Sequence, residues 1–342
     1  MRARILVVAA LLATTVAIAR SQGVRPLAVY WIDVEGGAAT LIVTPSGESL
    51  LVDAGNPGGR DPGRIVKTAT EAGVKRIDHL VVTHLHGDHF GGVAELSSLL
   101  PIGTLYENGI ENAPEQERSQ KTIPDYKAAK VEKRVVVQPG DFIRLGQTAG
   151  AAPIRVRVLA ARQKLASTER GRANAAICRE ATPKPVDTSD NANSIVMLFE
   201  QGPFRMFLGG DTTWNVEEKL VCPEDRVGPV DVYQSVHHGL DLSNNPVLVH
   251  TLQPHVVVFN NGARKGFEKG AVATVKATPS VQAIYQVHRA LYEGAQNTDD
   301  ARIANRDQEC KGEGIAMTVS PDGRAYTISI ASTGHRHTYQ TR

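Results

Sequence analysis

The chain has 342 residues, of which 42% are apolar, and its 38 basic and 36 acidic side chains give a formal charge of +2. This length fits one large α/β domain or two small ones, and the apolar content is sufficient for a substantial core. The nearly balanced charge excludes a broad electrostatic attraction to nucleic acid. We expect a single domain.

The N-terminus has the pattern of an export signal. Arg2 and Arg4 precede an apolar stretch over residues 5–18, and Ala17-Ile18-Ala19 fits a small-x-small cleavage site. We therefore predict a signal peptide over residues 1–19 and an exported protein, periplasmic or extracellular, over residues 20–342. Its formal charge is 0, because cleavage removes two arginines. The alternative is an uncleaved membrane anchor, although the apolar stretch is short for a span, which needs about 20 residues.

Two segments of the chain resemble each other. Residues 41–55 and 195–211 each read as a strand, a glycine-containing turn and a second strand that ends in an aspartate beside glycine. A helix is expected after each, the first with Asp61 as its N-cap. Buried strands over residues 78–84 and 231–237 follow. The strand ends meet at one edge, where α/β sheets usually place their sites. That edge would carry Asp53, His84, Asp211, His237 and His238.

The segment after the strand at 78–84 is typical of a metal-binding loop. His84, His86, Asp88 and His89 fall within six positions, and imidazole and carboxylate groups suit zinc and similar divalent ions. The i, i+2 spacing of the first two histidines sends both side chains to one face of an extended segment. One loop could therefore serve two metals. The alternative is a polar surface loop that happens to be rich in histidine.

The remaining segments are less specific. Residues 106–130 and 161–192 are long and polar, which indicates functional lids or disorder. Three cysteines are compatible with one disulfide in an oxidising compartment, and we predict that Cys178 pairs with Cys222 and leaves Cys310 free. Residues from about 263 to 342 read as a C-terminal extension of the domain, ending in a surface tail that contains His335 and His337.

The histidine-rich loop resembles the signature His-x-His-x-Asp-His of the metallo-β-lactamase superfamily. The order of further motifs is similar to that in the hydrolase domain of the ComEC/Rec2 competence proteins, over about residues 28–262. The resemblance implies an αββα sandwich of two packed sheets between outer helices, with a metal site at one edge. The residues that carry it are 31–38, 51–55, 84–89, 193–194, 210–211 and 237–239.

The resemblance also implies a set of ligands for two divalent metal ions. His84 and His86 would bind the first ion, Asp88 and His89 the second, and Asp211 would bridge both. His238 or His237 would complete the second site; the family pattern favours His238, whereas the match between the two halves of the chain favours His237. Asp53 would lie beneath the site and hold a ligand histidine by a hydrogen bond.

One departure from the family pattern concerns the first metal. Many relatives supply a third histidine four residues ahead of a serine that corresponds to Ser194, but the segment here is Asp190-Asn191-Ala192-Asn193. Either Asp190, Asn191 or Asn193 supplies an oxygen, or that ion has two protein ligands. An oxygen ligand would favour manganese or iron somewhat, while zinc is the leading expectation.

These observations predict an exported dinuclear metal-dependent hydrolase, in which metal-bound hydroxide attacks an ester-type bond such as a phosphodiester or lactone. Asp88 would orient the hydroxide and receive its proton, and His237 or His238 would assist as an electrophile. Lys265 or Arg264 would pair with an anionic substrate group, or belong to a solvated loop. His288 is either near the site or structural. The alternatives are a β-lactam-hydrolysing enzyme and, in another class, a non-catalytic metal-stabilised binding protein. The partner would be a small molecule or a phosphodiester; the sequence leaves nucleic acid open and does not indicate an oligomeric state.

Overall fold

The structure is a computed structural model that describes residues 24–167, 171–309 and 311–342. The predicted signal peptide and Cys310 lie outside the described residues. Within these ranges, none of the helices combines the length and the apolar character that a membrane span requires.

The first of two large sheets contains nine strands in the order β20-β19-β18-β1-β2-β3-β4-β5-β6. The alternating burial along β1 is typical of a strand, since Leu27, Val29 and Trp31 face the central core and Ala28 and Tyr30 face the other side. The strands are β1 (Leu27–Trp31), β2 (Thr40–Val43), β3 (Ser49–Val52), β4 (Ile77–Val81), β5 (Ile102–Glu107), β6 (Val131–Val136), β18 (Ile315–Val319), β19 (Ala325–Ile330) and β20 (His335–Gln340).

The second sheet has the order β17-β16-β15-β14-β12-β11-β8-β7, and β9 also pairs with β8. Its strands are β7 (Phe142–Ile143), β8 (Ile154–Ala161), β9 (Lys164–Leu165), β11 (Val196–Gln201), β12 (Phe204–Leu208), β14 (Val232–Gln234), β15 (Val256–Phe259), β16 (Ala283–His288) and β17 (Ile303–Asn305). A separate small sheet pairs β10 (Arg172–Ala173) with β13 (Glu224–Asp225).

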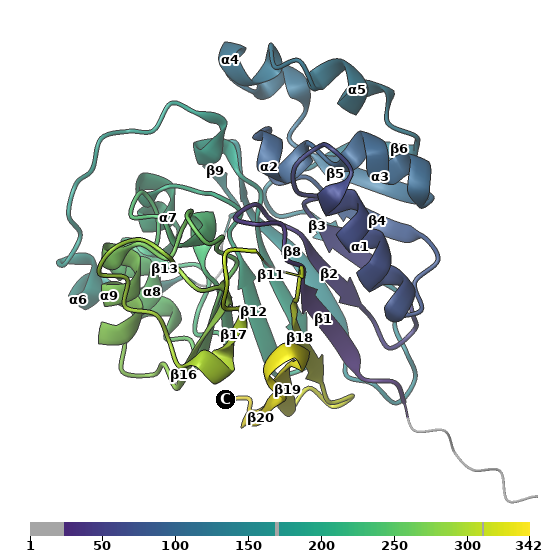
Figure 1. Cartoon of the computed structure of the whole chain (residues 1–342). Coiled ribbons are helices and arrows are strands. Elements are labelled where there is room, and N and C mark those ends of the chain that lie inside the picture. The colour runs from purple at the N-terminus through teal and green to yellow at the C-terminus, as the bar shows by residue number, and fades with distance from the viewer. Residues whose placement is uncertain (1–23, 168–170, 310) are drawn as a thin grey trace, which may run out of the picture.

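Helices cover the outer faces of both sheets. Figure 1 shows α1 and α3 on one side and α7, α8 and α9 on the other, with the sheets between them. The helices are α1 (Arg60–Glu71), α2 (Gly87–Phe90), α3 (Val93–Leu99), α4 (Glu115–Arg118), α5 (Ile123–Ala128), α6 (Ala175–Cys178), α7 (Trp214–Val221), α8 (Pro246–Leu252) and α9 (Lys269–Ala277). Short 3-10 turns are η1 (Ile110–Asn112), η2 (Asp190–Asn193), η3 (Val236–Gly239), η4 (Asp300–Arg302) and η5 (Ala331–Thr333).

Three apolar clusters define four layers. The central one joins the facing sides of the two sheets, with Val29 and Val52 from the first and Phe199 and Val258 from the second. A second cluster packs the outer face of the first sheet against α1, α3 and α5, and a third packs the outer face of the second sheet against α7, α8 and α9. Both faces of β2, β3 and β15 are covered, so these strands are buried along their whole length and consist mostly of apolar residues. The predicted αββα sandwich is confirmed.

The two similar halves of the sequence form equivalent units. β2 pairs antiparallel with β3, and β3 pairs parallel with β4 across α1. In the second sheet, β11 pairs antiparallel with β12, and β12 pairs parallel with β14 across α7. The loops after β3, β4, β12 and β14 therefore emerge from the carboxyl ends of their strands, which is where the ligand-type residues lie.

The disulfide prediction is confirmed, because Cys178 and Cys222 are joined and link α6 to the end of α7. Two local predictions were wrong. The helix cap is Gly59 rather than Asp61, whose carboxylate accepts hydrogen bonds from the backbone N–H and side chain of Asn56. The polar segment at 106–130, expected to be a lid or disordered, includes η1, α4 and α5. The expected C-terminal tail is strand β20, which pairs along its full length with β19 because its alternate residue Tyr339 is buried against Tyr326.

Candidate metal centre

The loops at the carboxyl ends of four strands meet at one edge of the sandwich. Asp53 follows β3, the histidine loop follows β4 and continues into α2, Asp211 follows β12, and His237 and His238 lie in η3 just after β14. Gly210, which has φ +55°, turns the chain between β12 and Asp211, and a Cβ at that glycine would lie 3.0 Å from Cβ of Thr83. The two halves of the fold thus contribute to a single site.

Four side chains at this edge could hold a metal ion. One ligand atom from each of Asp88, His89, Asp211 and His238 lies within 4.8 Å of all the others. His89 Nε2 is 3.1 Å from Asp211 Oδ2, 3.3 Å from His238 Nε2 and 3.6 Å from Asp88 Oδ2. His238 Nε2 is 3.3 Å from each of the two carboxylates. Tetrahedral ligands about 2.1 Å from zinc would be about 3.4 Å apart, so the four residues fit such an ion.

The protonation of His89 is fixed from behind by Asp53. Asp53 Oδ2 lies 2.8 Å from His89 Nδ1 and also accepts a hydrogen bond from the Thr83 hydroxyl, while Oδ1 accepts one from the Thr83 backbone N–H. A proton on Nδ1 of His89 leaves the lone pair of Nε2 directed at the cluster. Asp53 itself has φ 62°, a conformation held by these contacts.

The electrostatics of the cluster also suit a cation. Burial opposes ionisation of Asp211 and Asp88, but the surrounding histidines, and Lys265 for Asp88, lower the pKa of both carboxyl groups well below the usual value. Burial likewise opposes protonation of His89, yet the charges of the aspartates around it raise its pKa well above 6.5. Negative charge is therefore concentrated on Asp88 and Asp211, which favours the binding of a cation beside them.

The residues expected to bind the first metal lie next to this cluster. His84 Nε2 is 3.9 Å from Asp211 Oδ2, and the ring is buried. Burial lowers the pKa of His84 well below 6.5, so the ring is neutral, and no described residue forms a hydrogen bond with Nε2. A buried ring nitrogen without a partner costs free energy unless an ion or water binds it. The ring of His86 lies 4.7 Å from that of His84, centroid to centroid.

His237 and His238 take different places. His238 belongs to the four-residue cluster. His237 lies outside the cluster, with its Nε2 3.4 Å from Asp211 Oδ2 and its Nδ1 3.3 Å from the Ser243 hydroxyl. Burial lowers the pKa of His237 to about 4. The structure therefore groups His238 with the expected second metal and leaves His237 beside the bridging carboxylate.

Asp190 is directed elsewhere. Its Oδ2 accepts a hydrogen bond from the backbone N–H of Leu85 at 2.7 Å, and its Oδ1 accepts one from the Asn193 side chain at 2.8 Å. These contacts hold the loop between His84 and His86 in place. Asp190 thus supports the metal loop from outside the four-residue cluster.

The loop after β15 closes the other side of the centre. Lys265 forms an ion pair with Asp88 Oδ2, and 39% of its side chain is exposed. Close packing positions this loop: a Cβ at Gly266 would lie 2.1 Å from the carbonyl oxygen of His238, and a Cβ at Gly36 would lie 3.0 Å from Cβ of Lys265. Arg264 instead contacts Gln308.

Two further residues belong to the site, and one expected candidate does not. Thr83 and Glu117 contact the ligand histidines, and sequence reasoning missed both. Thr83 precedes His84 directly, which could have suggested it, whereas no spacing connects Glu117 to the loop. His288 Nε2 lies 2.6 Å from Asp33 Oδ1 in a separate buried pair. Of the two roles expected for His288, the contact with Asp33 therefore favours the structural one.

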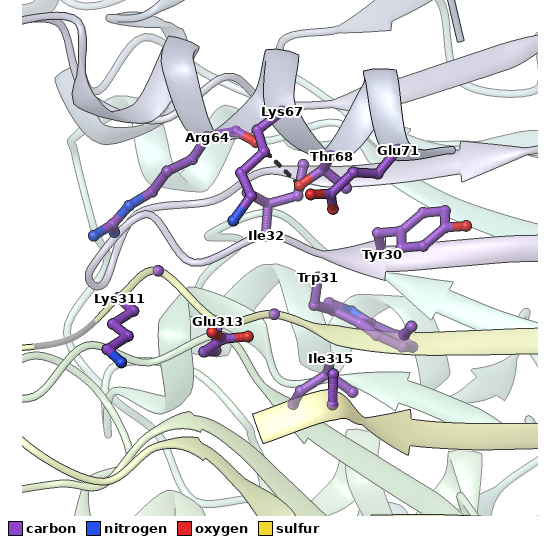
Figure 2. A pocket seen from close by; sticks show the side chains of 14 residues that line it. Tyr30, Trp31, Ile32, Arg64, Lys67, Thr68, Glu71, Lys311, Glu313 and Ile315 are labelled. Carbon is purple, nitrogen blue, oxygen red and sulfur yellow. Dashed lines mark hydrogen bonds between the residues drawn. The ribbon is translucent and has the colours of Figure 1, made fainter. Parts of the chain in front are cut away.

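A pocket between α1 and the strands β1 and β18 lies apart from this centre (Figure 2). It is lined in part by Tyr30, Ile32, Lys67, Glu71 and Lys311, and the metal-centre residues are not among its described walls.

The two-sheet sandwich carries a cluster of histidine and aspartate side chains at one edge, which could hold a metal ion. A family model described as the Metallo-beta-lactamase superfamily matches residues 32–166, which include the histidine loop. This part of the chain is therefore similar to the metallo-β-lactamase superfamily.

Individual relatives are similar over only part of their length. The chain is 35% identical over 107 residues to atrochrysone carboxyl ACP thioesterase dmxR1 of Cryptosporiopsis sp., which is 30% of this chain and 32% of that protein. It is 36% identical over 110 residues to lactamase-like protein nscB of Aspergillus fumigatus, which is 31% of this chain and 32% of that protein. Among solved structures, CmlA, a diiron β-hydroxylase from Streptomyces venezuelae, has a TM-score of 0.40 at 16% identity, covering 76% of this chain and 52% of that one.

Proposed function

We propose that this protein is an exported dinuclear metal-dependent hydrolase that cleaves an ester-type bond. The observation that carries the proposal is the cluster of Asp88, His89, Asp211 and His238, whose spacings of 3.1–3.6 Å fit one ion. The neutral His84 on the other side of Asp211 supplies the start of a second ion site. A shared carboxylate between two ligand sets is the arrangement that a two-metal centre requires.

Bound divalent ions would lower the pKa of water and polarise the oxygen of a carbonyl or phosphoryl group. The protein contributes position and charge. Asp88 is ionised at neutral pH and can orient the attacking water and take up its proton. Asp53 and Thr83 keep His89 in one tautomer, so the site does not reorganise when substrate arrives.

Lys265 is the candidate for substrate recognition. Its ammonium group contacts Asp88, and 39% of its side chain is exposed. A metal ion held by Asp88 would leave this ammonium group available to pair with an anionic group on the substrate. This supports a substrate that carries a carboxylate or phosphate near the scissile bond.

The class of bond is argued from the relatives and from charge. One similar protein is named as a thioesterase, which supports a carboxylic ester, lactone or thioester. The order of motifs resembles the hydrolase domain of ComEC/Rec2 proteins, which supports a phosphodiester as the second candidate. The formal charge of 0 on residues 20–342 disfavours tight binding of a long nucleic acid.

Export is proposed from the pattern of residues 1–19. The disulfide between Cys178 and Cys222 supports it, because such bonds persist in oxidising compartments.

The test is a metal analysis of purified protein followed by an activity screen with zinc, manganese and iron across lactone, thioester, phosphodiester and β-lactam substrates. We expect close to two ions per chain and hydrolysis that chelation abolishes. Asp88→Asn should remove activity, whereas Asp125→Asn, at an exposed position on α5, should not. Metal binding without turnover of any substrate would favour the non-catalytic binding protein.

A further inference from the structure

We propose that Glu117, on α4, is a direct protein ligand of the first metal ion and replaces the histidine that the 190–193 segment lacks. The inference rests on the proposed two-metal function and deepens it. Figure 1 shows α4 at the end of the molecule where α2 lies, and the contacts described below place its carboxylate at His86.

The carboxylate of Glu117 is buried and only partly hydrogen-bonded, which favours a cation beside it. The residue is 4% exposed, and its Oε2 has no hydrogen-bond partner among the described residues. Its Oε1 contacts His86 Nε2 and, at 3.3 Å, the backbone N–H of Asp190. Glutamate is rarely so buried unless it is paired or binds a metal. The partly exposed imidazole of His86 is the basic side chain in contact with it.

The separation of Glu117 and His86 fits shared coordination better than a salt bridge. Oε1 of Glu117 lies 3.4 Å from Nε2 of His86. A charge-assisted hydrogen bond between such groups is about 2.7–2.9 Å long. Two ligand atoms of one tetrahedral ion, each about 2.1 Å from the metal, are about 3.4 Å apart. The same spacing recurs between His238 and the carboxylates in the neighbouring cluster.

The segment that carries Glu117 is attached to the metal loop. The side chain of Gln120 donates a hydrogen bond to the carbonyl oxygen of Leu85 at 2.7 Å. At the start of the same segment, the side chain of Asn108 donates to the carbonyl oxygens of Thr83 and Asn193. These bonds fix both ends of the segment to the backbone around His84 and His86, so Glu117 is held in position.

Asp190, one of the three alternative oxygen ligands, is already engaged. Both carboxylate oxygens of Asp190 accept hydrogen bonds, from Leu85 and Asn193. Asp190 also orients Glu117, because its N–H donates to Oε1. A first site that contains Glu117 would have an oxygen donor where many relatives have a third histidine, and would therefore accept manganese or iron more readily.

The experiment compares metal affinity in the full-length mature protein. Wild type, Glu117→Gln, Glu115→Gln and Asp190→Asn are titrated with Zn²⁺ and with Mn²⁺ against a competing chelator, and bound metal is counted by mass spectrometry. Glu115 is the matched control, since it lies on the same helix with 77% of its side chain exposed. Folding is checked for each variant by circular dichroism and by urea unfolding.

We expect two ions in wild type and in E115Q. In E117Q we expect one retained ion and one bound at least about 10-fold more weakly, because loss of a residue that only supports a ligand already has an effect of that size. A metal-loaded crystal structure should place a Glu117 oxygen about 2.0–2.2 Å from the ion beside His86. The inference is wrong if E117Q matches E115Q, or if D190N alone loses the ion. If wild type binds two ions but hydrolyses no substrate, and E117Q loses one ion, the proposed function is wrong and Glu117 is still a ligand. If wild type binds only one ion, both the proposed two-metal function and the assignment of Glu117 are wrong.

Discussion

Asp53 Oδ2 and His89 Nδ1 lie 2.8 Å apart beneath the metal centre and are both buried. The contact joins the end of β3 to the start of α2 and fixes which nitrogen of His89 faces the cluster. Asp53→Asn should weaken metal binding about 10–100-fold, because a partner of this kind sets the orientation and basicity of a ligand histidine. Chelator competition measures it. Asp78→Asn, which alters a bond to Ser49 instead, should leave affinity unchanged, and equal affinities in both variants would contradict this role.

Lys265 should affect substrate affinity more than turnover. Lys265→Gln removes the ammonium group beside Asp88, so KM for anionic esters should rise about 10-fold, equivalent to about 1.4 kcal/mol, with a smaller change for neutral esters. Steady-state kinetics on a matched pair of charged and neutral substrates would show this. Arg264→Gln serves as the control because its side chain contacts Gln308. Equal changes for both substrates would argue against anion recognition.

Acidification should destabilise the metal-free protein through His237. Burial lowers its folded pKa to about 4, whereas in the unfolded chain it is about 6.5. Between these values the unfolded chain binds the proton and the folded chain does not, so the free energy of unfolding falls as pH falls, by up to about 3 kcal/mol. His237→Gln should flatten the dependence measured by urea unfolding from pH 7 to 4. His337→Gln, at an exposed position, should not, and identical slopes would refute the assignment.

The disulfide between Cys178 and Cys222 closes a loop with a sequence separation of 44. Restricting the unfolded chain in this way should stabilise the protein by about 2–4 kcal/mol. Urea unfolding with and without reductant gives the difference. Cys178→Ser should reproduce the reduced protein, while Cys310→Ser should resemble wild type; a Cys310 variant that unfolds as easily as the reduced protein would point to a different pairing.

Position 266 requires glycine for two reasons, its positive φ angle and the lack of space for a Cβ atom. Its φ is +81°, and a Cβ there would lie 2.1 Å from the carbonyl oxygen of His238. Gly140 has φ +98° with nothing within 4 Å of a Cβ, so it controls for the angle alone. Gly266→Ala should cost about 1–3 kcal/mol more than Gly140→Ala and should reduce metal affinity, because η3 must move. Thermal unfolding and metal titration test this, and equal costs would exclude the steric explanation.

Local chemistry was readable in the sequence. The four ligand-type residues of the loop at 84–89, the aspartates at the ends of two hairpins and the pair at 237–238 were visible as patterns, because strand periodicity and short-range spacing carry them. The repeated β-β-α-β units followed from the same patterns, whereas the sandwich was implied by the family resemblance. The Cys178–Cys222 bond was also predicted, since few pairings were available.

The tertiary structure determined the contacts that the spacing of residues along the sequence does not predict. Which of His237 and His238 joins Asp88, His89 and Asp211 depends on the positive φ of both residues in η3, and the sequence left that open. Glu117 reaches His86 only because a polar segment, expected to be a lid or disordered, folds back on the metal loop. The last residues form strand β20 and not a tail because they pair with the edge of β19. The sequence determined which residues are of ligand type and how strands and helices follow one another along the chain, since these depend on neighbours in the chain. Contacts between distant loops were determined by packing.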